Sequence, residues 1–244
     1  QIIMRRFGII GKPLGHSYSE RYFTEKFARE HIDATYHAFA IDQIKDVLPL
    51  LEELEGFNVT FPYKEAILPY LKGIDPIAEK IGAVNVVYQG IGYNTDWLGF
   101  KDSLHSMVGI MPQRALLLGT GGVSKAIQYA LDDMCIGYTL VSRQRKASGK
   151  MQEVIRYDEV DEKVLQVHTM VVNCTPLGMH PYENEFPAIP YQHIGNKHLL
   201  YDCIYNPSKT LFLREGEIRG CCIKNGLEML HRQADEAWQI WNKI

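Results

Sequence analysis

Apolar and polar positions alternate with two different periods along the first hundred residues. Short β-rich runs predict strands at residues 6–10, 35–41, 56–60 and 83–88. Between these runs, apolar residues at helical spacing predict helices at residues 19–31, 43–54 and 62–71. The last of these helices is expected to begin at Pro62, because the first helical position has no intrahelical N–H bond to lose. Strands separated by helices are typical of βαβ units and mostly parallel sheets.

A second series of strands and helices begins near residue 112. Strands are expected at residues 114–118, 138–142, 169–174 and 198–204, and a helix at residues 123–134. A connecting helix at residues 101–107 places a domain boundary near residue 100. The chain ends in a helical stripe of apolar and aromatic positions at residues 227–244. We therefore expect an α/β fold with two domains, residues 1–100 and 101–224, and a C-terminal helix at residues 225–244 that packs back on the first domain.

The composition excludes several classes of protein. The 244 residues are 46% hydrophobic and 23% charged, with a formal net charge of −3, which is typical of a globular protein and not of a disordered or fibrous one. The absence of a basic excess argues against a nucleic-acid binder. No apolar run approaches the ~18 residues of a membrane span, and the first residues lack a secretory signal. We expect a cytoplasmic protein without nucleic-acid or membrane partners.

The cysteines and histidines do not form a metal-binding pattern. The chain has five cysteines without C-x-x-C spacing, and its nine histidines are scattered. We expect buried, reduced thiols and no metal.

A glycine turn lies between a predicted strand and a predicted helix. In the segment 116–126, Gly119 permits a tight turn, and Gly121 lets backbone N–H groups approach a diphosphate at the helix N-terminus. The alternative is a turn that only connects the strand and the helix. After the next strand the chain reads Ser142-Arg-Gln-Arg-Lys146, with three cations and no carboxylate. This favours a 2′-phosphate, and hence NADP over NAD, with a solvated basic loop as the alternative.

Three polar stretches in the first half follow or precede predicted strands. They are Gly11-Lys-Pro-Leu-Gly-His-Ser-Tyr-Ser19, Asn58-Val-Thr-Phe-Pro-Tyr-Lys64 and Gly92-Tyr-Asn-Thr-Asp96. Loops at the carboxyl ends of strands form the ligand crevice of open α/β sheets. Hydroxyls, amides, a lysine and an aspartate suit a small polyol that carries a carboxylate. Each residue also has a structural interpretation, such as a helix cap for Ser19 or a surface position for Lys64.

Eight segments in order resemble the shikimate dehydrogenase family, and the resemblance spans nearly the whole chain. They include the three stretches above and Gly119-Thr-Gly-Gly122, together with Gly82-Ala-Val-Asn85, Asn173-Cys-Thr-Pro-Leu-Gly-Met179, Tyr201-Asp-Cys-Ile-Tyr205 and Gly226-Leu-Glu-Met-Leu-His-Arg-Gln233. The resemblance implies a substrate-binding domain, a Rossmann-like NADP-binding domain, and the reversible reduction of 3-dehydroshikimate to shikimate. That reaction belongs to aromatic amino-acid biosynthesis.

The resemblance also implies roles for individual residues. The catalytic pair is Lys64 and Asp96. The substrate-binding residues are Ser17, Ser19, Thr60, Asn85, Tyr205 and Gln233. The cofactor-binding residues are Gly119, Gly121, Gly122, Ser142, Arg143, Thr175, Gly226 and Met229. Reduction of a ketone by hydride leaves an alkoxide, so a lysine is suited either to donate the proton or to stabilise the charge.

Two departures and two rival functions stay open. Ser142 and Gln144 replace the asparagine and threonine of the family's N-R-T phosphate motif, while Arg143 is retained. A quinate/shikimate dehydrogenase with relaxed use of NAD and NADP is the nearest rival, since a pocket rejects one added hydroxyl weakly. A catalytically idle regulatory relative is the second rival. We expect a monomer or a homodimer.

Overall fold

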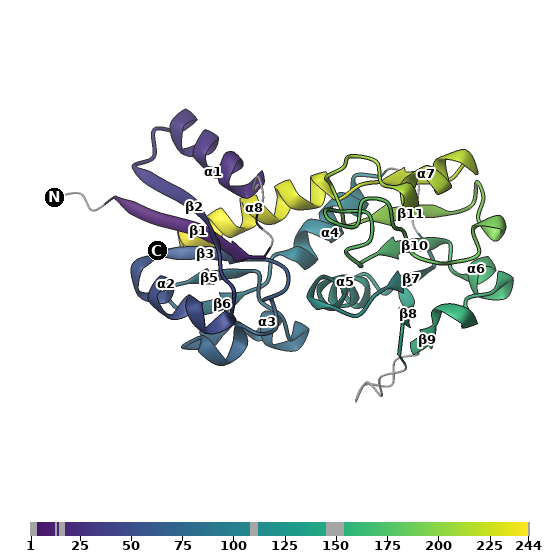
Figure 1. The fold of residues 1–244 in the computed structure, drawn as a ribbon, viewed down its shortest axis with the longest axis horizontal. Coiled ribbons are helices and arrows are strands. Elements are labelled where there is room, and N and C mark those ends of the chain that lie inside the picture. The colour runs from purple at the N-terminus through teal and green to yellow at the C-terminus, as the bar shows by residue number, and fades with distance from the viewer. Residues whose placement is uncertain (1–3, 13, 15–17, 108–111, 145–153, 244) are drawn as a thin grey trace. The chain divides into compact units, whose positions relative to one another are not determined.

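The computed structural model describes residues 4–12, 14, 18–107, 112–144 and 154–243. Its chain divides into two compact units. The first unit comprises Gln1–Thr95 and Gln233–Ile244, and the second comprises Asp96–Arg232. Figure 1 labels helices and strands of both units.

The first unit contains a six-stranded mixed sheet in the order β2-β1-β3-β5-β6-β4. Strands β1, β2 and β3 are parallel, whereas β5 is antiparallel to both β3 and β6. Its elements are β1 (Arg5–Gly11), α1 (Tyr18–Arg29), β2 (Ala34–Ala40), η1 (Ile44–Val47), α2 (Leu48–Glu53), β3 (Gly56–Val59), η2 (Leu68–Tyr70), β4 (Gly73–Ile74), α3 (Pro76–Ile81), β5 (Val86–Tyr88) and β6 (Ile91–Tyr93). The last helix of the chain, α8 (Leu227–Trp241), contributes its C-terminal part to this unit.

Aromatic side chains fix the end of α8 on the sheet of the first unit. Trp241 is fully buried, stacks on Phe7 with ring centroids 4.7 Å apart, and donates from Nε1 to the carbonyl of Val87 at 3.1 Å. A Cβ atom added to Gly56 would lie 2.4 Å from that same Nε1 atom. The indole therefore occupies the space that a side chain on β3 would take. This packing sets the position of Gln233, two turns earlier in the helix.

The prediction of a helix at residues 62–71 is wrong. The segment forms turns and only the short 3-10 helix η2. Pro69 has no N–H to donate to the carbonyl of residue 65, and its ring crowds that carbonyl, so an α-helix cannot continue through it. The structure also contains β4, α3 and β6 in the first unit, which the sequence analysis did not predict.

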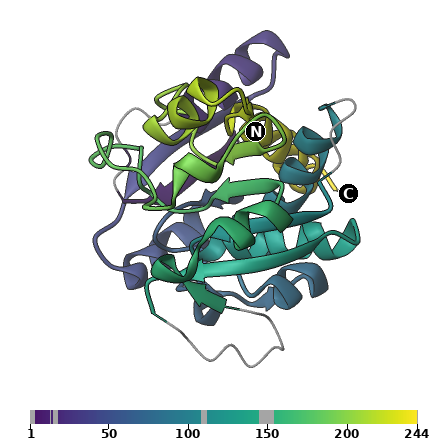
Figure 2. The same ribbon diagram turned by 90° about the vertical axis from the view of Figure 1, so that its right-hand side faces the viewer.

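The second unit contains an all-parallel six-stranded sheet in the order β12-β11-β10-β7-β8-β9. Counted from the other edge, this is the strand order of dinucleotide-binding folds, with a switch point between β7 and β10. The elements, seen from a second side in Figure 2, are α4 (Asp96–His105), β7 (Arg114–Leu118), α5 (Gly122–Asp133), β8 (Gly137–Ser142), β9 (Val154–Arg156), η3 (Tyr157–Glu159), α6 (Glu162–Val167), β10 (Met170–Asn173), η4 (Tyr191–His193), β11 (Leu199–Asp202), α7 (Leu211–Ile218), β12 (Cys222–Lys224) and the start of α8.

Successive side chains of β7 point to opposite faces of this sheet and pack in two separate cores. Ala115 and Leu117 pack in a cluster with residues of α4, α5 and the start of α8. Leu116 and Leu118 pack in another cluster with residues of α6 and α7. The sheet is thus covered by helices on both faces, which explains why its strands read as continuous apolar runs. The predicted fold class is confirmed. Elements β9, α6, α7 and β12 were not among the predicted ones.

The described residues contain no helix that is long and apolar enough to cross a membrane. All five cysteines are free thiols. Within the same residues, no group of three or more histidine, cysteine, aspartate or glutamate side chains is arranged to hold a metal ion.

Candidate active site

Lys64 is held by its backbone in the turn that follows β3. The carbonyl of Lys64 accepts from the N–H of Val84 at 2.8 Å, and the N–H of Tyr63 donates to the carbonyl of Thr60 at 3.0 Å. The buried Tyr63 side chain donates its hydroxyl to the carbonyl of Ile41 at 2.7 Å. Thr60 and Lys64 are both half-buried. The turn therefore presents two predicted site residues from a fixed backbone.

Asn85 and Gln233 are brought together by a buried network, although 148 residues separate them. The Asn85 Nδ2 group donates to Gln233 Oε1 at 3.1 Å and to Thr95 Oγ1 at 3.0 Å. The Thr95 N–H donates to Asn85 Oδ1 at 2.7 Å, and its hydroxyl donates to the Gln233 carbonyl at 2.9 Å. These contacts orient both amides before any ligand arrives. Thr95 is a positioning residue that the sequence analysis did not single out.

Ser19 belongs to a second buried network in the first unit. Its side chain is hydrogen-bonded to Tyr36, whose pKa is raised well above the ordinary value chiefly by burial. The Tyr36 hydroxyl donates to Asn58 Oδ1 at 2.7 Å, and Asn58 Nδ2 donates to the carbonyl of Asn85 at 3.3 Å. Ser19 is thereby linked to the backbone beside Asn85. Ser17, its predicted partner, lies outside the described residues.

The glycine turn of the second unit fits a diphosphate. Gly119 has φ +105°, and a Cβ there would crowd Thr175 at 3.1 Å. Gly121 is the exposed N-cap of α5, and nothing lies within 4 Å of where its Cβ would be. The N–H groups at the start of α5, including that of Gly122, carry the positive end of a twelve-residue helix. The open space and the donors suit the diphosphate of a dinucleotide cofactor.

Ser142 is the last residue of β8, and Arg143 directly follows it. Ser142 is buried and its Oγ accepts from the N–H of Gln144 at 3.4 Å, whereas the Arg143 side chain is exposed. Arg143 and Gln144 line a pocket of about 500 Å³ together with Arg156 and Glu159. The other two predicted cations, Arg145 and Lys146, lie outside the described residues.

A buried carboxylate fixes the loop that carries Thr175. Asn173 Oδ1 accepts from the Thr175 N–H at 3.0 Å and from its hydroxyl at 2.6 Å. Asn173 Nδ2 in turn donates to Asp202 Oδ1 at 3.1 Å. Asp202 also accepts from the Ile204 N–H at 3.0 Å and from Thr210 Oγ1 at 2.5 Å. Sequence reasoning assigned no role to Asp202, although it lies in a quoted motif, because its partners come from three separate segments.

Burial raises the pKa of Asp202 to about 7, while the hydrogen bonds from Thr210, Ile204 and Asn173 act in the opposite direction. The side chain is fully buried, so desolvation of the charged form is the larger effect.

The start of α8 approaches the loop after β11 closely. A Cβ on Gly226 would lie 2.2 Å from the carbonyl oxygen of Cys203, so only glycine fits there. The Gly226 N–H donates to the carbonyl of Ile204 at 3.0 Å. Met229 is buried in the core of the second unit, and Tyr205 is half-buried in the loop. Close backbone packing thus accounts for the glycine independently of any ligand.

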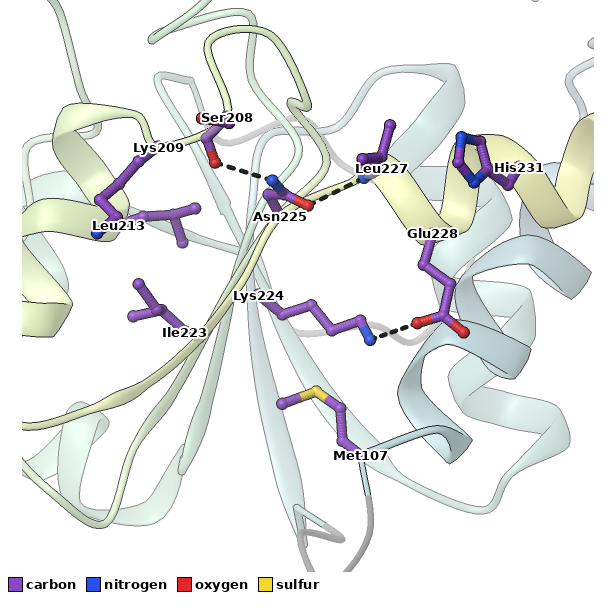
Figure 3. Close-up of a pocket in the computed structure, with 10 residues that line it drawn as sticks. All are labelled: Met107, Ser208, Lys209, Leu213, Ile223, Lys224, Asn225, Leu227, Glu228 and His231. Atoms are coloured by element: carbon purple, nitrogen blue, oxygen red, sulfur yellow. Dashed lines mark hydrogen bonds and ion pairs between the residues drawn. The ribbon is translucent and has the colours of Figure 1, made fainter. Parts of the chain in front are cut away.

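A pocket of about 530 Å³ lies beside this turn in the second unit (Figure 3). Its Lys224 side chain points toward Glu228, with Nζ and Oε2 2.7 Å apart, and Lys209 is paired with Glu217 at 2.7 Å. Asn225 donates to the carbonyl of Ser208 at 2.8 Å across the pocket. Both lysines are thus paired with carboxylates. It contains none of the predicted site residues.

The predicted residues divide between the two units. The first unit holds the described residues Ser19, Thr60, Lys64, Asn85 and Gln233. The second unit holds Asp96, Gly119, Gly121, Gly122, Ser142, Arg143, Thr175, Tyr205, Gly226 and Met229. Asp96 is buried at the first position of α4, where the helix dipole favours a carboxylate.

The parallel sheet with a glycine turn at the N-terminus of α5 defines a dinucleotide-binding fold. The first unit carries a buried polar network that joins Asn85, Thr95 and Gln233. Residues 9–87 match the family model described as the shikimate dehydrogenase substrate binding domain. A shikimate dehydrogenase (NADP(+)) of Bacillus cereus is 35% identical over 96% of this chain and 91% of its own length. The chain belongs to the shikimate dehydrogenase family.

Solved structures agree with this assignment. The crystal structure of shikimate dehydrogenase from Aquifex aeolicus matches with a TM-score of 0.85 and 32% identity, covering 99% of this chain and 94% of that one. The Thermus thermophilus enzyme, solved in complex with NADP(H) and shikimate, matches with a TM-score of 0.85 and 28% identity, again over 99% and 94%. The resemblance given by the eight sequence segments is therefore confirmed.

Proposed function

We propose that this chain catalyses the NADP-dependent, reversible reduction of 3-dehydroshikimate to shikimate, a step of aromatic amino-acid biosynthesis. The observation that carries the proposal is family membership over 96% of the chain. Asn85 and Gln233 of the predicted site are hydrogen-bonded to each other at 3.1 Å, and the backbone carbonyl of Lys64 is held by Val84, which supports the proposal. The protein is proposed to act as a monomer or homodimer in the cytoplasm, where its five free thiols suit a reducing environment.

Substrate binding is assigned to Ser17, Ser19, Thr60, Asn85, Tyr205 and Gln233. Ser17 and Ser19 hold the carboxylate in this proposal, while Thr60, Asn85 and Gln233 bind the hydroxyls. The Asn85–Gln233 bond at 3.1 Å supports these roles, because amides already fixed by hydrogen bonds lose little freedom when a polyol binds.

Cofactor binding is assigned to the second unit. Bound NADPH supplies the hydride. Gly119, Gly121 and Gly122 are proposed to hold the diphosphate and Arg143 the 2′-phosphate. Ser142, Thr175, Gly226 and Met229 complete the proposed cofactor site. The exposed Gly121 with open space before it supports the first assignment.

Lys64 and Asp96 are the proposed catalytic residues. The ketone oxygen of the substrate becomes an alkoxide during reduction and must receive a proton. The Lys64 ammonium is suited to donate that proton or to stabilise the negative charge, and the turn after β3 fixes its backbone. Asp96 is assigned to a substrate hydroxyl.

Initial rates of nicotinamide reduction test the function. The purified chain is assayed with shikimate and with quinate, each paired with NADP⁺ and NAD⁺. Fast turnover only with shikimate and NADP⁺ is expected. Comparable rates with quinate or NAD⁺ would indicate a dehydrogenase of broader specificity, and no turnover with any pair would indicate a catalytically idle relative.

Variants of Lys64 separate its two roles. We expect Lys64→Met to lower turnover by about 10²–10⁴-fold, the range for loss of a general acid. Lys64→Arg keeps the positive charge but does not readily give up a proton, so substantial activity in this variant would favour charge stabilisation. Lys45→Met, at an exposed position of the same unit, is the control. Normal turnover and an unchanged pH profile in Lys64→Met would exclude both roles.

A further inference from the structure

Arg156 lies beside the predicted 2′-phosphate residues on a strand that the sequence analysis did not predict. Strands β8 and β9 are parallel, and Ser142 pairs in register with Arg156. Both strands end at this point, so their carboxyl ends present neighbouring side chains at one edge of the sheet. Arg143 and Arg156, with Gln144 and Glu159, line the pocket of about 500 Å³.

This edge is the place where dinucleotide-binding folds recognise the adenosine ribose. The 2′-substituent is read at the end of the second strand, which is β8 here. A phosphate is bound best by more than one planar guanidinium, because each provides charge-assisted N–H donors. Arg143 directly follows β8, and β9 adds the second guanidinium, that of Arg156. The family's threonine is replaced by Gln144, which makes a donor from the neighbouring strand more important.

Two carboxylates hold the side chain and backbone of Arg156. Its Nη2 lies 2.7 Å from Asp158 Oδ2, and its backbone N–H donates to Glu159 Oε2 at 2.7 Å. The Arg156 Nε atom is 3.9 Å from the same Glu159 oxygen. Arg156 keeps a half-exposed side chain, at 51%. Glu159 lines the pocket as well, so a carboxyl group lies at the same pocket as the two arginines.

We propose that Arg156 is a second phosphate-binding residue for NADP, and that Glu159 opposes it and limits the preference for NADP over NAD. The proposal rests on the function proposed above and adds the residues that set its cofactor specificity. A carboxylate repels a 2′-phosphate but accepts a hydrogen bond from a 2′-hydroxyl. Arg156 therefore favours NADP, whereas Glu159 favours NAD.

Binding of two small probes tests this inference without catalysis. Calorimetry measures the affinity of the chain for two ligands. Adenosine 2′,5′-bisphosphate carries the 2′-phosphate, and adenosine 5′-monophosphate lacks it. We expect Arg156→Gln to weaken binding of the bisphosphate about tenfold, which corresponds to the loss of one hydrogen bond to a charged group. The affinity for the monophosphate should stay unchanged. Glu159→Gln keeps an oxygen for the Arg156 N–H and removes the charge, so it should strengthen bisphosphate binding by roughly threefold.

Arg29→Gln is the matched control, because Arg29 is an exposed arginine of α1 whose loss changes the net charge equally. Unchanged bisphosphate affinity in Arg156→Gln, or an equal loss for both probes, would overturn the proposal. Equal affinities of the wild-type chain for the two probes would overturn it too. That result would also contradict the preference for NADP in the proposed function. A wild-type preference for the bisphosphate that survives Arg156→Gln would refute this inference alone.

Discussion

Replacement of Asp202 by asparagine should change how stability depends on pH. The carboxyl group is fully buried at the end of β11 and accepts three hydrogen bonds, of which the shortest is from Thr210 at 2.5 Å. Burial nevertheless raises its pKa from 3.8 to about 7. An asparagine at this position keeps the shape and one acceptor oxygen, and its amide faces a threonine hydroxyl that is able to accept.

The magnitude follows from the difference between the folded and unfolded pKa values. The pKa of Asp202 rises from 3.8 to about 7, which is a shift of about 3 pH units. At 1.36 kcal/mol per unit, this shift corresponds to ~4 kcal/mol. The folded chain holds the proton up to about pH 7, whereas the unfolded chain releases it near pH 3.8. The stabilising contribution is therefore complete below pH 3.8 and is lost as the pH rises through 7.

Urea unfolding of both chains at several pH values between about 4 and 8 checks this reasoning. The unfolding free energy of Asp202→Asn minus that of the wild type should increase with pH, by up to ~4 kcal/mol over this range. Asp42→Asn is the control, because Asp42 is exposed and Lys12 lowers its pKa. Parallel pH dependences of the wild type and Asp202→Asn would refute the assignment of a raised pKa to this carboxyl.

Two further substitutions test close packing around α8. Gly226→Ala places a Cβ 2.2 Å from the Cys203 carbonyl oxygen and should destabilise the chain by about 1–3 kcal/mol in thermal unfolding; an unchanged melting temperature would contradict the packing argument. Trp241→Phe removes the hydrogen bond to Val87 and should cost about 1–2 kcal/mol in urea unfolding. Trp238→Phe, at a partly buried position of the same helix, is the control and should cost less.

The sequence was informative where local pattern decides structure. Residues 114–118 were predicted as a strand and form β7, since a run of apolar residues ending in a glycine turn has few alternatives in an α/β chain. The helix predicted at 123–134 forms as α5, one residue earlier at each end. These two elements and the turn between them are also the part of the proposed cofactor site whose backbone structure was predicted best.

Prediction failed at one proline whose effect outweighs the apolar pattern, and at elements that distant contacts decide. Apolar spacing at residues 62–71 favoured a helix, but Pro69 prevents one, and the segment is held instead by bonds such as that from Val84 to the Lys64 carbonyl. The short strands β9 and β12 have three residues each and acquire their hydrogen bonds only from neighbours distant in sequence. For the same reason the role of Asp202 was not visible, because Asn173 lies 29 residues away.

Both units use a buried asparagine side chain to hold other side chains in place. In each, a buried amide connects a predicted ligand-binding residue with a residue to which the sequence analysis assigned no role: Asn85 connects Gln233 with Thr95, and Asn173 connects Thr175 with Asp202. An amide suits this position because it donates from one end and accepts at the other, so it links two segments without burying an extra charge. No buried side-chain nitrogen or oxygen among the described residues lacks a hydrogen-bond partner. Such networks join strand ends, loops and, in the first unit, helix α8, and a ligand then meets groups whose orientation was set by folding.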